Sequence, residues 1–207
     1  MSDAEWLSDK ARGKVRDGIV ALEANSGAEV VATVCARSGH YRHADYLLGA
    51  LFALLALLFY LLYPEPLFDD VAVVLVVASF AVGAVLCASV SPVRRLFLSR
   101  KLMNDEVRKA ARAKFVEQGI GRTSGRTGIL VYVSLFERRV EVVPDIGIPV
   151  QRLGKRWEDA VASLDTSAKK GVEPFLTALA AMGPMLTEAV PRAANDVNEL
   201  PDDVVQA

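Results

Sequence analysis

The sequence predicts a small α/β/α sandwich whose chain is interrupted by a transmembrane helical hairpin. Two long apolar segments without a charged residue, 46–63 and 71–90, lie near its middle. Short segments rich in β-branched residues, 28–36 and 129–136, lie on either side of them, each near an amphipathic helical pattern. Because one strand and one helix cannot bury a core alone, we expect the flanking parts to form one discontinuous α/β domain.

Residues 1–44 are expected to supply the first helix and strand of this domain. Ser8 is a plausible N-cap for a helix over 8–26, and Gly27 fits the position that ends it. The helix places four apolar residues on one face: Ala11, Val15, Ile19 and Leu22. The run AEVVATVCA at 28–36 then predicts a buried strand.

Residues 45–91 are expected to form the membrane hairpin, with span ends at Tyr46 and Tyr63 and at Val71 and Val90. Segments of this length reach roughly 27–30 Å as helices, which matches the hydrocarbon core of a bilayer. A pair of buried core helices is the alternative, but the apolar character runs all round each segment instead of forming a stripe.

The flanks of the hairpin predict its orientation. The connection at 64–70 carries three acidic residues and no basic one, whereas the outer flanks are basic. The positive-inside rule therefore predicts a multi-pass protein of a cell membrane, of the bacterial inner-membrane type, with both termini and the soluble domain in the cytoplasm. His40 and His43 lie in the basic flank without an evident third ligand, so we expect interfacial anchors and no metal site.

Residues 92–190 are expected to complete the α/β domain. A helix from about Asn104 to 118 precedes a glycine-rich loop at 119–128. The strand at 129–136 follows, and Glu137-Arg138 is expected to turn the chain into a half-buried partner strand at 139–143. Two helices near 151–164 and 168–189 complete this part, and 191–207 reads as an acidic, loosely ordered tail.

Three segments of the chain resemble the TPM domain family, also called TPM phosphatases. They are the first helix leading through Gly27 into AEVVATV, the loop and strand GIGRTSGRTGILVYVSL, and the hairpin strand RRVEVVPDIGI. The resemblance covers about 130 residues once the hairpin is skipped, and it implies a small α/β/α sandwich. Many family members carry Asp-Asn-Gly or Lys-Asn-Gly before the central strand, where this chain has Arg-Thr-Gly at 126–128. Many also carry Gly-x-Gly after the second hairpin strand, where this chain has Asp-Ile-Gly at 145–147.

The residues leave two functions open. One is a membrane-bound phosphatase that hydrolyses phosphoesters. Its catalytic candidates are Asp145 and Arg126, and its ligand-binding candidates are Arg122, Ser124 and Arg126. Whether it uses a divalent cation as a cofactor stays open. The glycine-rich loop leads into a strand and follows a helix C-terminus, which is unfavourable for anions. We therefore favour the other function, an interaction or assembly module for membrane or envelope proteins.

The composition limits the classes of partner that we expect. The formal net charge of −1 gives no basic surface of the kind that nucleic acid requires, so we expect no nucleic-acid partner. The lipid bilayer and other membrane proteins are the expected partners, and homo-oligomerisation through the hairpin stays open. Cys35 and Cys87 lie in apolar runs without metal-ligand spacing and are expected to be buried thiols.

Overall fold

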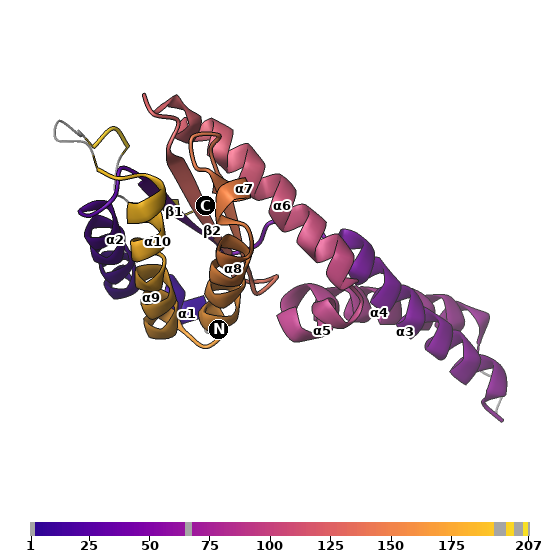
Figure 1. Cartoon of the computed structure of the whole chain (residues 1–207). Helices are drawn as coiled ribbons and strands as arrows, with labels where there is room; N and C mark the ends of the chain where they lie inside the picture. The colour runs from indigo at the N-terminus through magenta and orange to yellow at the C-terminus, as the bar shows by residue number, and fades with distance from the viewer. Residues whose placement is uncertain (1–2, 65–67, 193–197, 201–204, 207) are drawn as a thin grey trace. The chain divides into compact units, whose positions relative to one another are not determined.

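The computed structural model describes residues 3–64, 68–192, 198–200 and 205–206. The chain divides into two compact units (Figure 1). One unit joins residues 1–38 to 104–207, and the other consists of 39–103. The first unit is an α/β domain and the second a helical hairpin inserted after the first strand, as the sequence predicts.

A mixed sheet forms the centre of the α/β unit. Its strands are β1 (Glu29–Cys35), β2 (Gly128–Ser134), β3 (Arg139–Pro144) and the short β4 (Val205–Gln206), in the order β3-β2-β1-β4. β1 and β2 are parallel, whereas β3 runs antiparallel to β2 and β4 parallel to β1. The strand before the hairpin therefore pairs with the strand beyond it, which confirms the discontinuous domain.

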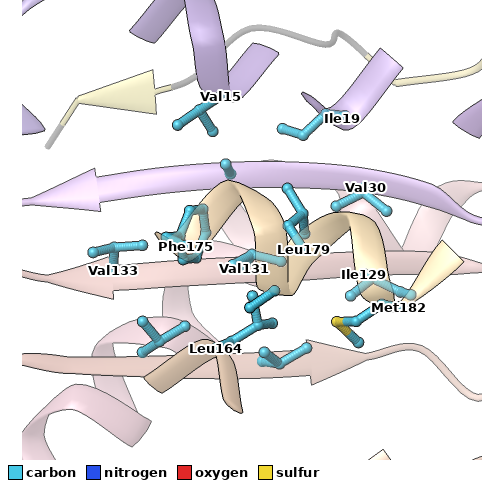
Figure 2. Packing of buried hydrophobic residues seen from close by; sticks show 14 of the residues in the cluster. Val15, Ile19, Val30, Ile129, Val131, Val133, Leu164, Phe175, Leu179 and Met182 are labelled. Carbon is cyan, nitrogen blue, oxygen red and sulfur yellow. The ribbon is translucent and has the colours of Figure 1, made fainter. Parts of the chain in front are cut away.

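One face of the sheet carries the larger core. Side chains alternate between the two faces of a strand, and Val30, Val131 and Val133 point to this face. The covering helices are α2 (Asp9–Glu23), α8 (Lys155–Ala168), α9 (Val172–Ala181) and α10 (Gly183–Ala189). Figure 2 shows Val15 and Ile19 of α2 beside β1, and Phe175 and Leu179 of α9 beside the strands. The short α1 (Asp3–Trp6) adds Trp6, whose ring meets Phe175 edge-on with centroids 5.1 Å apart.

The opposite face of the sheet packs against α6 (Arg100–Glu117). Val107 and Ala111 of α6 are fully buried against Leu130 and Tyr132 of β2 and the neighbouring residues of β1. Helices thus cover both faces of the sheet. The α/β/α sandwich is confirmed, and its two cores explain why β1 and β2 are buried at every position.

Two helix boundaries differ from the sequence prediction. Ser8 caps α2 as expected, with its Oγ accepting from Ala11 N at 3.2 Å, but α2 already ends at Glu23. Gly27 is not the end of that helix; its N–H donates to Val190 O at 2.9 Å. Asn104 is not a cap either, because α6 begins one turn earlier, where Ser99 Oγ accepts from Leu102 N.

The region expected to be one helix over 168–189 is broken. Gly171, with φ of 137°, precedes α9, and α10 starts at Gly183 with a proline in its first turn. The helix expected at 151–164 is likewise divided at Gly154 into α7 (Val150–Leu153) and α8. The breaks at Gly154 and Gly171 occur at glycines in conformations that side chains rarely adopt. The β2–β3 turn is also longer than expected, since Leu135–Arg138 all lie in it.

The inserted unit contains α3 (Arg42–Leu62), α4 (Asp69–Ser89) and the short α5 (Ser91–Leu96). α3 and α4 are long and apolar enough to cross a membrane, and only 17% and 11% of their apolar windows are buried. A core helix of a soluble protein would be mostly buried, so the described residues do not fit that alternative. The two glycines pack the helices closely: a Cβ on Gly83 would lie 2.3 Å from the Phe52 ring, and one on Gly49 2.9 Å from Phe80 O.

An ion pair joins the start of α3 to α5 within this unit. Both carboxylate oxygens of Asp45 accept from Arg94, from Nε and from Nη2, each at 2.8 Å. The Arg94 and Asp45 side chains are 10% and 12% exposed. Cys87 of α4 lies beside the pair, fully buried, with its Sγ donating to Ala44 O. The pair therefore ties α5 to the first turn of α3.

Candidate functional site

The loop between α6 and β2 is built as a compact turn. The 3₁₀ helix η1 (Ile120–Arg122) follows Gly119, and Ile120 is fully buried in the core beneath α6. Thr123, also buried, accepts from Thr127 N through its Oγ1 and from Arg126 N through its carbonyl, both at 3.0 Å. This turn holds Arg126 at φ of 55°, a conformation that costs a non-glycine residue roughly 1 kcal/mol.

Arg126 and Asp145 meet at the end of the sheet where β2 begins and β3 ends. Arg126 Nε donates to Asp145 Oδ2 at 2.7 Å, and Nη2 donates to Oδ1 at 2.9 Å. Oδ1 also accepts from Ile146 N at 2.8 Å. The Asp145 side chain is 4% exposed and that of Arg126 is 50% exposed. The hydrogen bonds from Arg126 lower the pKa of Asp145, and burial opposes them.

Backbone contacts fix the same junction. Asp145 N donates to Gly128 O and Gly147 N to Arg126 O, both at 2.8 Å. A Cβ on Gly147 would lie 2.3 Å from Gly125 O and 2.5 Å from Arg126 O, so the chain passes here without room for a side chain. The ion pair and these bonds hold the loop against the end of β3.

These hydrogen bonds engage the Asp145 carboxylate, which is the group that a hydrolytic mechanism at this site would use. Both oxygens of Asp145 accept hydrogen bonds, and in the part of the chain that the structure describes no three His, Cys, Asp or Glu residues are grouped to hold a metal ion. Arg122 is exposed on η1, and half of the Arg126 side chain faces solvent. The exposed parts of these two arginines are suited to binding an anionic group.

Ser124, the remaining candidate of the loop, contacts the tail. Its N–H donates to both carboxylate oxygens of Glu199, at 2.9 and 3.2 Å, and its Oγ donates to Glu199 Oε1 at 2.5 Å. These bonds lower the pKa of Glu199, and the bond from the Ser124 hydroxyl has the larger effect. Sequence reasoning missed Glu199, because the residue lies in a segment without periodicity 75 positions beyond its partner.

A second polar cluster was also missed, at the opposite end of the parallel strands. Ser38 Oγ lies 2.7 Å from Ser134 Oγ and 3.1 Å from the Tyr132 hydroxyl. Glu137 accepts from Ser38 N at 3.0 Å and from the Ser134 hydroxyl. Burial is the largest of the causes that raise the pKa of Tyr132. In the sequence, Ser134 was the residue that could have indicated this cluster, because it is polar at the end of an apolar strand. In the structure it pairs with the end of β1.

Replacing Asp145 by asparagine is expected to destabilise the α/β unit by about 1–2 kcal/mol at neutral pH, since the hydrogen bonds to charged Arg126 are weakened. Because its pKa is lowered in the folded state, the carboxylate contributes stability above the unfolded pKa near 4, and this is lost as the pH falls through the lower folded value. Thermal unfolding of the detergent-purified protein at pH 3–7 measures the difference, which is expected to shrink below about pH 4.

The matched control is Asp159→Asn, which removes an exposed carboxylate of α8. It is expected to shift the melting temperature little at any pH. Equal effects of the two variants at neutral pH would contradict the structural role assigned to the Asp145–Arg126 pair.

The fold is similar to that of the BA42 protein from the psychrophilic bacterium Bizionia argentinensis, whose structure was determined by NMR. The TM-score is 0.59, and the similarity covers 100% of this chain and 99% of that chain at 14% sequence identity. The two proteins share a TPM-domain-like fold. No protein-family model and no curated protein sequence matches the chain. Identity of this order establishes the fold and assigns no activity.

Proposed function

We propose that the protein is a membrane-anchored interaction module, in which the α3–α4 hairpin lies in a bilayer and the α/β domain binds or organises other membrane or envelope proteins. The apolar surface of the hairpin carries the proposal. Large apolar residues are exposed on the surfaces of both helices that face away from their mutual contact, including Leu54, Leu58, Val74 and Val82. Soluble proteins seldom expose a continuous apolar surface of this extent, and lipid is the environment that such helices require.

The charges at the two ends of the hairpin support a cytoplasmic position for the α/β domain. Arg42 at the start of α3 and Arg95 in α5 lie on one side of the spans, together with Arg100 and Lys101. Asp70 lies at the connection between the spans. By the positive-inside rule this distribution favours a cell membrane of the bacterial inner-membrane type with the basic end in the cytoplasm.

The polar loop favours binding over hydrolysis. Asp145 accepts hydrogen bonds on both oxygens, and Ser124 donates to Glu199. The hydrogen bonds from Arg126 lower the pKa of Asp145, which makes its carboxylate a weaker general base. The contacts of these two residues instead join the loop to β3 and to the tail, which suits a recognition surface.

A membrane-bound phosphatase is the second candidate. The observation in its favour is the half-exposed guanidinium of Arg126, which lies in the same short loop as exposed Arg122 and Ser124. Such a group of cations and donors can hold the oxygens of a phosphoryl group. A divalent cation would then have to supply the activated water.

Cysteine labelling tests the membrane anchor and its orientation. In a Cys35→Ala/Cys87→Ala background, one variant carries Lys10→Cys on exposed α2 and another carries Pro64→Cys at the exposed end of α3. With an impermeant maleimide on intact bacterial cells, we expect only the Pro64→Cys variant to react, whereas opened membranes should also expose Lys10→Cys. Labelling of Lys10→Cys in intact cells would overturn the orientation, and recovery of the protein in the soluble fraction would overturn the anchor.

Hydrolysis of p-nitrophenyl phosphate separates the two candidate functions. We expect the detergent-purified protein to show no turnover above an Asp145→Asn control, with or without Mg²⁺, Mn²⁺ or Ca²⁺. Turnover that depends on the cation and is lost in the Asp145→Asn variant would establish the phosphatase instead.

A further inference from the structure

The two edges of the sheet are protected in different ways. An uncovered edge strand presents unpaired backbone groups that recruit further strands. At the β3 edge, Asp165 of α8 accepts from Val140 N at 2.8 Å, so a side chain from the folded core occupies the donor. At the β1 edge, Val205 and Gln206 pair with Thr33 and Val34 as the short parallel strand β4. Among the residues that the structure describes, a segment of the tail thus covers the β1 edge.

The tail makes two further contacts near the start of β1. Glu199 accepts from the backbone and the hydroxyl of Ser124. Leu200 packs against the core cluster beneath α6, and its N–H donates to Glu29 Oε2 at 3.3 Å. A carboxylate, the apolar side chain that follows it, and a short strand are therefore bound in sequence along one edge of the domain.

The tail is held on the domain in the way that a separate peptide ligand would be held. Glu199 is exposed and β4 contains two residues, so each contact is weak by itself. The receiving groups, by contrast, belong to rigid elements: Ser124 lies in the loop fixed by Arg126 and Asp145, and Thr33 is fully buried. A segment held in this way can be replaced by another of the same chemistry.

We propose that the edge of β1 and the loop 119–128 bind an extended segment of a partner protein that carries a carboxylate directly followed by an apolar residue, and that the chain's own tail fills this site until the partner displaces it. The carboxylate binds Ser124, the apolar residue enters the cluster beneath α6, and the rest of the segment adds to β1. The inference rests on the proposed function, because it names the surface through which the module binds.

A peptide titration on the full-length protein tests the proposal. The probe is a fluorescein-labelled peptide of residues 195–207, NDVNELPDDVVQA, which carries the required chemistry. Its anisotropy is measured in detergent with the wild-type protein and with Glu199→Ala/Leu200→Ala, in which the tail of the protein is weakened. We expect the peptide to bind the double variant at least about tenfold more tightly, since the tail no longer competes at high effective concentration.

Three controls define the site. A peptide with Glu199→Lys and a Ser124→Asp change in the double variant are each expected to weaken binding at least about tenfold. The first removes the carboxylate that Ser124 binds, and the second places a like charge opposite that carboxylate. Ser163→Asp, on an exposed face of α8, is expected to leave the affinity unchanged. Circular dichroism melts of all protein variants are expected to coincide within a few degrees, since the substituted residues are exposed or lie in the tail.

The proposal is overturned if the peptide binds wild-type and double-variant protein equally, or if Ser124→Asp has no effect on its affinity. A wild-type dimer in native mass spectrometry that Glu199→Ala/Leu200→Ala dissociates would make the occupant the tail of a second copy, which also overturns the partner-protein form. Either result leaves the membrane anchor untouched, because cysteine labelling tests the anchor separately.

Discussion

Replacing Arg94 by methionine is expected to destabilise the helical hairpin by roughly 3 kcal/mol, because it leaves the Asp45 carboxylate without its partner in a nearly closed environment. Two readouts follow the change. The melting temperature of the detergent-purified protein is expected to fall. Cys87, which is fully buried beside the pair, is expected to react faster with N-ethylmaleimide in a Cys35→Ala background.

Two variants control this experiment. Arg95→Met removes a cation from the same short helix without touching the pair and is expected to change neither readout much. Asp45→Leu/Arg94→Met removes both charges and is expected to recover most of the lost stability, since no unpaired charge remains. If Arg94→Met and Arg95→Met behave alike, the pair does not hold the hairpin together.

The second large effect is expected from Gly147→Ala, which should lower the free energy of unfolding by roughly 2–3 kcal/mol. The added Cβ would meet two backbone oxygens, of Gly125 and Arg126, at 2.3 and 2.5 Å. Backbone atoms cannot swing aside as the end of a flexible side chain can, so the loop must move away from β3. Thermal unfolding measures the loss, expected as a decrease of about 5–10 °C.

Gly13→Ala is the matched control for this change. Gly13 lies in the middle of α2, and a Cβ there would meet nothing within 4 Å. Alanine is the better helix former, so the variant is expected to gain up to about 1 kcal/mol. A Gly147→Ala protein that melts with the wild type would show that the loop has room that the structure does not give it.

The sandwich was predictable because its elements follow simple periodicities. Most residues of β1 and β2 are apolar, which indicates strands covered on both faces, and the apolar residues of α2 repeat with helical spacing. The breaks in the last helices were not predicted, since the apolar pattern continues through Gly171 and Gly183. Only the packed chain shows that α9 and α10 each contact the core separately.

The candidate site was predictable in part for a topological reason. An antiparallel hairpin returns the chain to the end of the sheet where it began, which brings Asp145 to the loop that precedes β2. Sequence could not show that Arg126 would engage both oxygens of Asp145, because that depends on the left-handed turn at Arg126. The contact between Ser124 and Glu199 joins segments too distant for any local pattern to report.

The position of the hairpin also sets the order of events during synthesis. Glu29 pairs with Gly128, 99 residues further along the chain. At the usual rates of translation, β1 leaves the ribosome on the order of 5–20 s before its partner exists. Both apolar helices are made during this interval. In the proposed membrane-bound protein, the bilayer therefore receives the hairpin first, and the sheet closes only around a chain that is already inserted.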